Sequence, residues 1–471
     1  MQSPPYLSRR EMLSCAGSGF GLLALADLLC AESSATVAGQ PDRAVQPFAV
    51  RPPHHTPRAK RIIFLYMPGG PSHVDLFDLK PRLAAENGKP LPFKKPRLLR
   101  TETDNLLASP WRFSRHGQSG IEVTELLPGI ASSIDDICVI RSMLADNINH
   151  TGAALQMCTG EQAFSRPSMG SWLTYGLGTE NQNLPSFVVV SPTPVFQEAQ
   201  LWASSFLPSA YQGTLVRDMD KPINNLIDPR DNINRQRTKL DALGRLNVIH
   251  KRKRIIDSQL DARIASFELA FRMQREAPEA FDLSRETESM HKMYGTDDEA
   301  TQLFGRQCLM ARRLVERGVR FVQLFDAPRN NAWDQHGNLR KALPERCRAV
   351  DQPITALLTD LKARGLLEDT LILWGGEFGR TPTAEGTDGR EHHPFGFTMW
   401  LAGGGVRGGM VHGATDDYGW HAVQDIVHVH DLHATILHLM GIDHERLTYR
   451  HSGRDYRLTD VFGNVVQQIL A

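Results

Sequence analysis

Short runs of apolar residues alternate with amphipathic stretches along most of this 471-residue chain. An uninterrupted apolar run is typical of a strand that is buried on both faces of a sheet. Stretches in which apolar residues recur about every three or four positions are typical of helices that cover such a sheet. Because the two kinds of segment alternate, the sequence predicts an α/β fold in which helices sandwich a central, mostly parallel mixed sheet.

The apolar runs predict strands at Arg61–Met67, Ile137–Arg141, Phe187–Val190, Val319–Phe325, Thr370–Trp374 and Phe397–Ala402. The amphipathic stretches predict helices at Glu299–Arg317, Leu343–Arg364 and Asp431–Met440.

One region breaks this alternation. Between Asn232 and Glu276, apolar residues recur with helical spacing over an unusually long span. Such spacing predicts a helix or a helical hairpin, inserted into the α/β domain at about residues 230–290. The basic run Lys251–Arg254 within it could grip an anionic polymer, but such a run is more typical of a solvated helix face.

The beginning of the chain resembles a twin-arginine export signal, because the pair Arg9-Arg10 precedes a weakly apolar segment, Ser14–Leu29. That segment is short and polar for a transmembrane span. We assign residues 1–38 to the signal, residues 39–57 to a linker rich in Pro, Arg and His, and residues 58–471 to the folded domain. The signal predicts export to the periplasm or the cell surface. A disordered cytoplasmic tail is the alternative.

The charge balance excludes some classes of partner. The chain has 53 basic and 53 acidic residues, so its formal net charge is zero. Nothing in this balance favours nucleic acid or an acidic membrane as a partner. Outside the signal, the cysteines lie far apart without a C-x-x-C pair, which indicates neither a zinc knuckle nor a disulfide framework.

Polar side chains follow several of the predicted strands. The strand Thr370–Trp374 is followed by glycines and then by Glu377, Arg380, His392 and His393. A carboxylate, a guanidinium and paired imidazoles at the end of a parallel strand are the groups that a metal and anion site requires. An ordinary polar loop, in which Arg380 pairs with Glu377, is the alternative.

Further candidates follow other strands. A W-D-Q-H segment carries Asp334 and His336, whereas His73 and Asp75 follow the first strand. His150 follows the second predicted strand. Each histidine alone is typical of a hydrogen-bonded loop residue, but the carboxyl ends of parallel strands share one edge of a sheet, so we expect the set to converge. Imidazole and carboxylate ligands favour zinc or manganese as the divalent metal, and leave iron and calcium open.

Several longer motifs resemble those of a known bacterial family. These motifs are G-G-P-S-H-V-D-L-F-D, W-D-Q-H-G-N, G-G-E-F-G-R-T-P and H-H-P-F-G-F-T-M-W-L-A-G-G-G. They resemble the family catalogued as domain of unknown function 1501, and Val429–Gly441 is similar to a helix of the alkaline phosphatase and sulfatase superfamily. The resemblance covers nearly all of the chain after the linker. It implies an alkaline phosphatase-like fold with metal at the carboxyl edge of the sheet, but no established reaction.

The resemblance implies one well-matched metal position. Superfamily members build it from an aspartate and a histidine after a middle strand, together with a late histidine. Asp334, His336 and either His392 or His393 match these ligands.

The second metal position of the superfamily is matched less well. It takes an aspartate directly after the first strand and a later Asp-His pair. Here His73 and Asp75 are displaced along the loop as substitutes, and Glu377-Phe378 replaces the later pair. One imidazole ligand is thereby lost.

The resemblance also bears on the nucleophile. His150 stands where sulfatases carry the cysteine that becomes formylglycine, which argues against a formylglycine-dependent sulfatase. Thr151 would instead attack the ester after activation by the cation. Alternatively, water activated by the cation attacks, and His150 acts as acid, base or further ligand. Arg380 or Arg141 would hold the substrate oxyanion through paired N–H donors.

The leading hypothesis is therefore an exported, metal-dependent hydrolase of phosphate or sulfate esters, acting on small molecules or anionic polysaccharides. Its expected protein partner is the twin-arginine export machinery. The departures at the second metal position support an alternative, an exported binding protein that a metal stabilises and that has lost hydrolytic chemistry. A purely structural surface protein is a third interpretation, and it predicts that no metal co-purifies.

Overall fold

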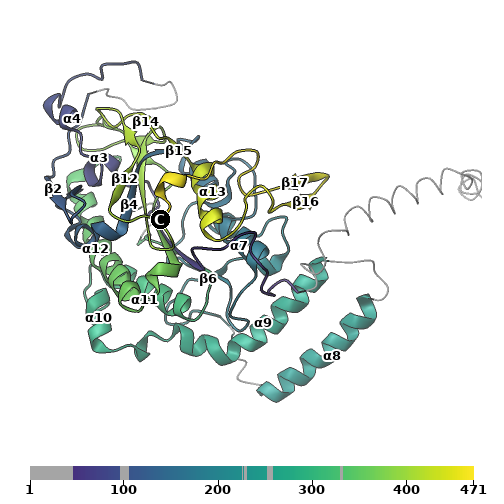
Figure 1. The fold of residues 1–471 in the computed structure, drawn as a ribbon. Helices are drawn as coiled ribbons and strands as arrows, with labels where there is room; N and C mark the ends of the chain where they lie inside the picture. Colours follow the sequence, from purple (N-terminus) through teal and green to yellow (C-terminus); the bar gives the residue numbers. More distant parts are fainter. Residues whose placement is uncertain (1–45, 96–104, 225, 227–230, 252–257, 329–331) are drawn as a thin grey trace, which may run out of the picture.

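The structure is a computed structural model that describes residues 46–95, 105–224, 226, 231–251, 258–328 and 332–471. Within these residues, a nine-stranded sheet forms the centre of the molecule (Figure 1). The strand order is β12-β4-β11-β8-β1-β7-β5-β6, and β15 pairs with β4 as well.

The strands of this sheet are β1 (Arg61–Tyr66), β4 (Ile137–Leu144), β5 (Phe187–Val190), β6 (Thr214–Val216), β7 (Phe321–Phe325), β8 (Thr370–Gly375), β11 (Phe397–Ala402), β12 (Met410–His412) and β15 (Val427–His428). Strand β11 runs antiparallel to its neighbours β4 and β8, whereas the other pairings are parallel. The predicted mostly parallel mixed sheet is therefore confirmed.

Helices cover both faces of the sheet (Figure 1). Helices α11 (Gln302–Glu316) and α12 (Leu339–Ala363) lie on one face. Helices α6 (His150–Thr159), α7 (Met169–Leu177) and α13 (Val429–Leu439) lie on the other face. This arrangement confirms the predicted α/β class, with helices on both sides of the sheet.

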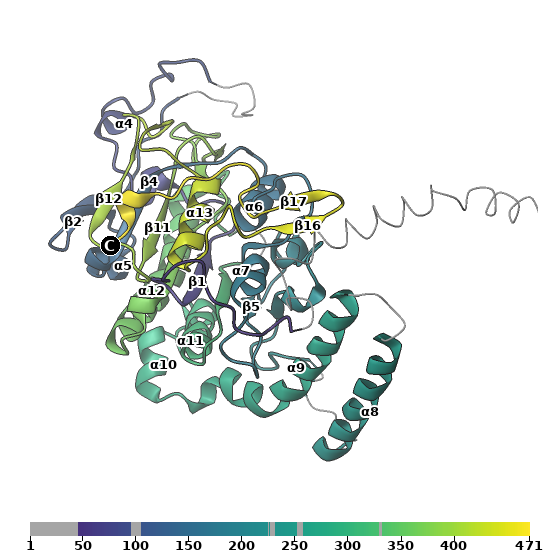
Figure 2. The same cartoon turned by 45° about the vertical axis from the view of Figure 1, so that its right-hand side comes forward.

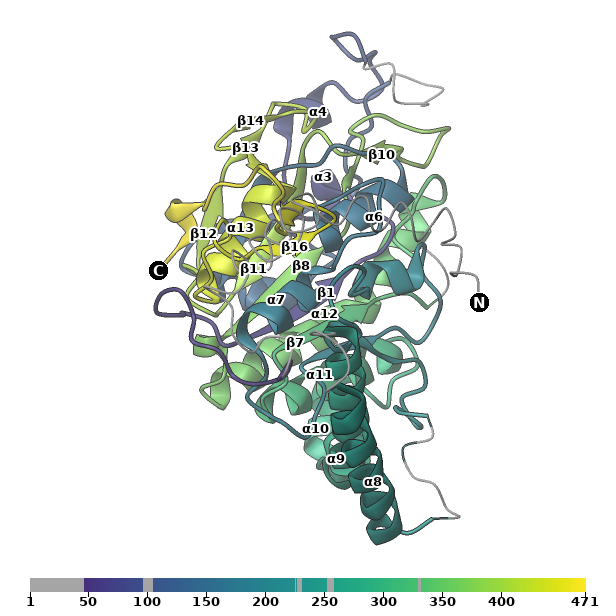
Figure 3. The same ribbon diagram turned by 90° about the vertical axis from the view of Figure 1, so that its right-hand side faces the viewer.

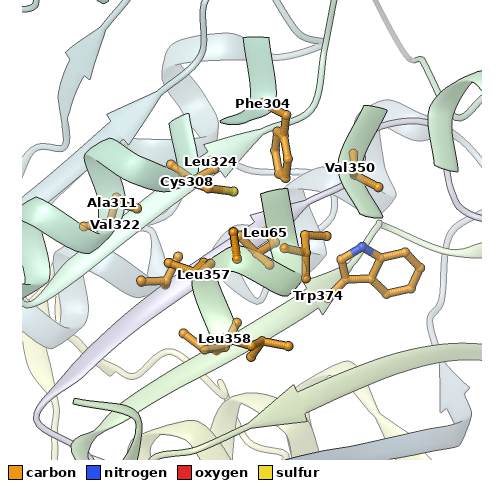
Figure 4. Packing of buried hydrophobic residues seen from close by; sticks show 14 of the residues in the cluster. Leu65, Phe304, Cys308, Ala311, Val322, Leu324, Val350, Leu357, Leu358 and Trp374 are labelled. Carbon is orange, nitrogen blue, oxygen red and sulfur yellow. The ribbon is translucent and has the colours of Figure 1, made fainter. Parts of the chain in front are cut away.

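The alternation of side chains along a strand divides the core in two. Along β1, Ile63 and Leu65 join the core beneath α11 and α12, whereas Ile62 and Phe64 join the core beneath α6, α7 and α13. Figure 4 shows Leu65 and its neighbours from the sheet packed against side chains of α11 and α12. Full burial of one such aliphatic side chain contributes roughly 1.5–3 kcal/mol, so both layers stabilise the strands that carry the site.

The helical insertion consists of α8 (Ile233–Lys251) and α9 (Ser258–Phe281). The two helices lie side by side and stand away from the sheet (Figures 1 and 2), and Figure 3 shows them extending beyond the body of the molecule. Both terminal nitrogens of Arg237 on α8 lie 2.9 Å from Glu268 on α9. Of the basic run, residues 252–254 lie outside the described residues.

The start of the described chain lies against the domain. Residues 1–38 of the predicted signal and 39–45 of the predicted linker lie outside the described residues. The remainder of the linker is anchored: Phe48 is buried, Arg51 donates its backbone N–H to Leu177, and His54 donates to Gly441. Within the described part of the chain, no helix is both long and apolar enough to cross a membrane.

Candidate metal centre

The carboxyl ends of three strands hold the candidate site. His150 is the first residue of α6, which follows β4, and Asn149 caps this helix by accepting a 3.0 Å hydrogen bond from the backbone of Thr151. Asp334 and His336 follow β7. Strand β8 leads to Glu377 and then to the short strands β9 (Gly379–Arg380) and β10 (His392–His393), which pair antiparallel.

Three imidazoles face the carboxylate of Asp334. The Nε2 atom of His150 lies 3.1 Å from Oδ2, and those of His336 and His392 lie 3.0 and 3.3 Å from Oδ1. One ligand atom from each of these four residues lies within 4.8 Å of the others. Three imidazole nitrogens around one carboxylate form a donor set that suits a divalent transition metal.

The opposite nitrogen of each imidazole is held by an outer acceptor. Nδ1 of His150 lies 2.6 Å from Glu377, Nδ1 of His336 lies 2.5 Å from Glu385, and Nδ1 of His392 lies 2.7 Å from the carbonyl of Ile148. In metal-binding histidines this second hydrogen bond fixes the ring and leaves the lone pair of the other nitrogen for the metal.

The environment of His150 provides a further test of whether these residues fit a metal ion. Nε2 of His150 is buried without a hydrogen-bond partner, although the carboxylate of Asp334 is close to it. A buried polar atom in this state is costly unless something binds it. The residues present therefore fit a bound cation.

Glu377 is held firmly in its place behind His150. It is buried, and it accepts hydrogen bonds from the hydroxyl of Tyr66 at 3.0 Å and from the backbone N–H of Gly69 at 2.9 Å. Burial alone would raise the pKa of Glu377, but hydrogen bonds from His150 and the Gly69 backbone lower it. The carboxylate is therefore charged and can fix the orientation of His150.

Gly69 allows the loop after β1 to pass close beneath the site. Its φ is +113°, and a Cβ atom there would lie 2.5 Å from the backbone nitrogen of Asp334. Any other residue would displace Asp334 or the loop, because both the space and the backbone angle favour glycine.

Arg380 neutralises the charge of Asp334 from the protein interior. Its Nη2 lies 2.5 Å from Oδ1 of Asp334 and also donates to the carbonyl of Gly69, whereas Nε and Nη1 donate to the carbonyls of Gly70 and Arg390. The side chain is fully buried. The sequence predicts that Arg380 or Arg141 holds a substrate oxyanion, and the structure places the N–H groups of Arg380 against the protein.

The hydrogen bonds also shift the pKa values of the site. Burial would raise the pKa of Asp334, but the three histidines beside its carboxylate hold the pKa well below its usual range. The bond to Asp334 raises the pKa of His336 to about 9. Burial would lower the pKa of His150, but the nearby carboxylates of Asp334 and Glu377 raise it. Burial lowers the pKa of His392. A bound cation would therefore displace protons.

Four of the predicted ligands are not part of this cluster. Glu377 lies behind His150 and bonds its Nδ1 atom, and three others lie farther away. His73, on α3 (His73–Leu76), and His393 are fully buried with stacked rings 5.9 Å apart. Their Nε2 atoms lie 2.8 Å from the carbonyl of Gly419 and 2.5 Å from that of Trp420. The structure thus places these two histidines in a separate network.

Asp75, also on α3, forms a buried ion pair with Arg390, at 2.7 and 3.0 Å. This carboxylate is therefore engaged by a guanidinium rather than directed at the three imidazoles. Thr151 lies one residue beyond His150 and is half-buried. Arg141 lies within β4, and its Nε atom is 3.7 Å from Oδ1 of Asp78.

Some residues of the site were not anticipated from the sequence. Tyr66 donates to Glu377, which holds His150, and Glu385 bonds directly to His336. Phe378 is buried and packs against the rings of His150 and His392, with centroids 5.0 and 4.8 Å away. Tyr66 is the last residue of an apolar strand and Phe378 follows a carboxylate, so neither carries a local signal of its role.

Comparison with solved structures finds distant similarity. The lipoteichoic acid synthase LtaP from Listeria monocytogenes is 10% identical over 88% of this chain and 79% of its own, with a TM-score of 0.34. The PsFucS1 sulfatase from Pseudoalteromonas sp. is 13% identical over 82% of this chain and 69% of its own, with a TM-score of 0.35. The alkaline phosphatase from the Antarctic bacterium TAB5 is 10% identical over 82% of this chain and 98% of its own, with a TM-score of 0.33.

Comparison of the sequence with curated proteins gives no match. A family model described as "Protein of unknown function (DUF1501)" matches residues 59–470. The match therefore includes every residue of the candidate metal centre.

Proposed function

This chain belongs to the DUF1501 family, and on that premise we propose that it is an exported, metal-dependent hydrolase of phosphate or sulfate esters. The observation that carries the proposal is the convergence of three imidazole Nε2 atoms on Asp334, each ring being fixed through its Nδ1 atom. His150 belongs to this set, so the reaction proposed does not depend on formylglycine.

The residues of the cluster have distinct proposed roles. Asp334, His150, His336 and His392 would hold the cation, and this donor set favours zinc or manganese. When bound, such a cation supplies a Lewis acid that polarises an ester oxygen and activates a hydroxyl group or water.

The buried residues around the cluster position its ligands. Arg380 holds Asp334 through a buried ion pair, and Glu377 holds His150 through a short hydrogen bond. Arg380 and Glu377 are buried, and Asp334 and His150 are only partly exposed, so these bonds are stronger than they would be at the surface. The ligands are thus fixed before substrate arrives.

Thr151 is the proposed nucleophile. It lies in the first turn of α6, one residue beyond His150, where the positive end of the helix dipole favours an anionic group. Its hydroxyl would attack the phosphoryl or sulfuryl centre of a small or polysaccharide ester. Attack by water is the alternative within the same site.

Export is proposed from the twin-arginine signal. Proteins with this signal cross the membrane already folded, so the cation would be inserted in the cytoplasm and carried out with the protein. Replacement of both Arg9 and Arg10 by lysine tests the proposal. We expect the variant to remain in the cytoplasmic fraction, and export as complete as that of the wild type would contradict it.

One observation favours a second candidate, a metal-stabilised binding protein without hydrolytic activity. His73 and His393 bond to backbone carbonyls and Asp75 pairs with Arg390, so these three residues are engaged away from the cluster. The substitution His336→Ala separates the candidates. An enzyme would lose turnover, whereas a binding protein would keep its ligand affinity or lose only stability.

Metal content is the first test of the proposal. Mass spectrometry of protein purified from an export-competent host should find about one equivalent of a transition metal per chain. His392→Gln should remove most of it, whereas His393→Gln, which changes the adjacent buried histidine, should not. No metal in the wild type, or equal loss in both variants, would contradict the assigned site. The metal-loaded protein is then assayed with phosphate and sulfate esters.

A further inference from the structure

An exposed phenylalanine lies directly beside the metal centre. The ring of Phe196 stacks on the imidazole of His150, with centroids 5.9 Å apart and 15° between the ring planes. Although it contacts this ring, Phe196 remains 49% exposed. The open face of this ring, beside a candidate ligand, can stack on a second ring.

The inner side of His150 is already packed. Phe378, which is buried, lies with its ring centroid 5.0 Å from that of His150. Glu377 fixes the Nδ1 atom of the same imidazole. His150 is thus held in place without Phe196, so the exposed face of the Phe196 ring is available to bind a ligand.

The backbone that presents Phe196 is strained. Phe196 lies on the loop that follows β5, whose carboxyl end is at the same edge of the sheet as those of β7 and β8. The next two residues, Gln197 and Glu198, have φ angles of +64° and +28°. Residues other than glycine adopt such angles rarely, and such strain is concentrated at functional sites.

The loop is also held in place. Arg217 donates to the carbonyl of Ser191 at 2.8 Å and to the carboxylate of Glu198 at 3.0 Å. The hydroxyl of Thr193 donates to the carbonyl of Ala327, which follows β7, and Val195 is buried. Phe196 is therefore an exposed ring on an anchored loop, which is the arrangement of a pre-formed contact surface.

We propose that Phe196 forms a ring-binding subsite beside the metal centre. Its ligand is a six-membered ring with an apolar face, carried by the part of the ester that does not react. An aryl group and the apolar face of a pyranose share this chemistry. The proposal rests on the proposed hydrolase function, because it assigns the ring to the substrate of that site.

The contribution of the subsite follows from ring stacking, which changes affinity by about three- to tenfold. Phe196→Ala should therefore raise the KM for a ring-bearing ester by about this factor, with little change in kcat. The KM for an ester without a ring should not change. Phe196→Tyr should restore the wild-type KM, because it restores the ring.

The experiment uses the full, metal-loaded chain with phenyl phosphate, glucose 6-phosphate and ethyl phosphate as substrates. Phe462→Ala is a matched control, because Phe462 is 58% exposed and stacks on His430 at 5.1 Å and 13°, outside the cluster. A selective effect on phenyl phosphate alone identifies an aryl subsite, and one on glucose 6-phosphate identifies a pyranose subsite. Equal changes in KM for all three substrates, or loss of metal in Phe196→Ala, overturn the proposal.

A binding measurement separates this proposal from the proposed function. Calorimetry with phenylphosphonate and ethylphosphonate needs no turnover. If no ester is hydrolysed but Phe196→Ala weakens only phenylphosphonate binding, the hydrolase function fails and the subsite stands. If esters are hydrolysed but Phe196→Ala binds and converts ring-bearing ligands as the wild type does, the subsite fails and the hydrolase function stands.

Discussion

The guanidinium of Arg380 lies 2.5 Å from the carboxylate of Asp334, and Arg380 has no exposed surface. The ion pair joins strand β9 to the segment after β7, so it fixes the one carboxylate that all three imidazoles face. Because Arg380 is fully buried, the position of the Asp334 carboxylate depends on this ion pair.

Removal of the guanidinium should therefore destabilise the protein. Arg380→Gln leaves the partly buried charge of Asp334 without this cation. Because the Asp334 side chain is 22% exposed, we expect a loss of roughly 1–3 kcal/mol, below that for a fully buried pair. Urea unfolding of the metal-free protein measures this change. Arg340→Gln breaks an exposed pair with Asp388 and should have little effect. Equal effects of the two substitutions would contradict the role of Arg380.

Loss of the charge behind His150 should weaken metal binding. Glu377→Gln keeps the shape of the side chain but removes the carboxylate that holds Nδ1 of His150. Substitution of a residue that hydrogen-bonds a metal ligand typically lowers metal affinity by about 10- to 100-fold. Competition with a chelator measures the affinity. Asp369→Asn, just before the opposite end of β8, should leave it unchanged, and a similar loss there would count against a specific role for Glu377.

Turnover should depend on the hydroxyl of Thr151. Thr151→Val keeps the branched shape but removes the nucleophile, so we expect turnover to fall by at least about 10³-fold while the metal content is unchanged. Thr151→Ser should recover part of the rate, because it restores a hydroxyl. Wild-type turnover in Thr151→Val would instead identify water as the nucleophile.

A buried histidine outside the site predicts a pH dependence of stability. His433 on α13 is fully buried, and its Nε2 lies 2.8 Å from the carbonyl of Met157. Burial lowers its pKa from 6.5 to about 3. Between these two values the unfolded chain binds a proton that the folded protein does not bind. The contribution of His433 is therefore complete above about pH 6.5 and is lost as the pH falls toward 3.

The substitution His433→Gln isolates this effect, because glutamine can keep an N–H donor but does not titrate. The free energy of unfolding of the variant should change less steeply between about pH 4.5 and 6.5, by up to about 1.4 kcal/mol per pH unit. Urea titrations across this range measure the slope. An unchanged slope would show that His433 is not the group responsible.

The strands were largely predictable because burial on both faces leaves a local pattern. Phe187–Val190 and Phe397–Ala402 have the bounds that their apolar runs predict. The direction of β11 was not predictable, since a fully buried strand shows the same apolar run whether it is parallel or antiparallel. Likewise, the anchoring of residues 46–57 depends on Leu177 and Gly441, which are distant in the sequence.

The sequence by itself determined which polar groups follow the strands, because the strand ends are marked by a change from apolar to polar residues, with glycines after β1 and β8. Only the tertiary structure decided which of two adjacent histidines faces Asp334. His392 pairs with Arg380 and His393 with Gly379 between β10 and β9. Successive side chains of a strand point to opposite faces, so this register directs His392 to the metal centre and buries His393 against Trp420.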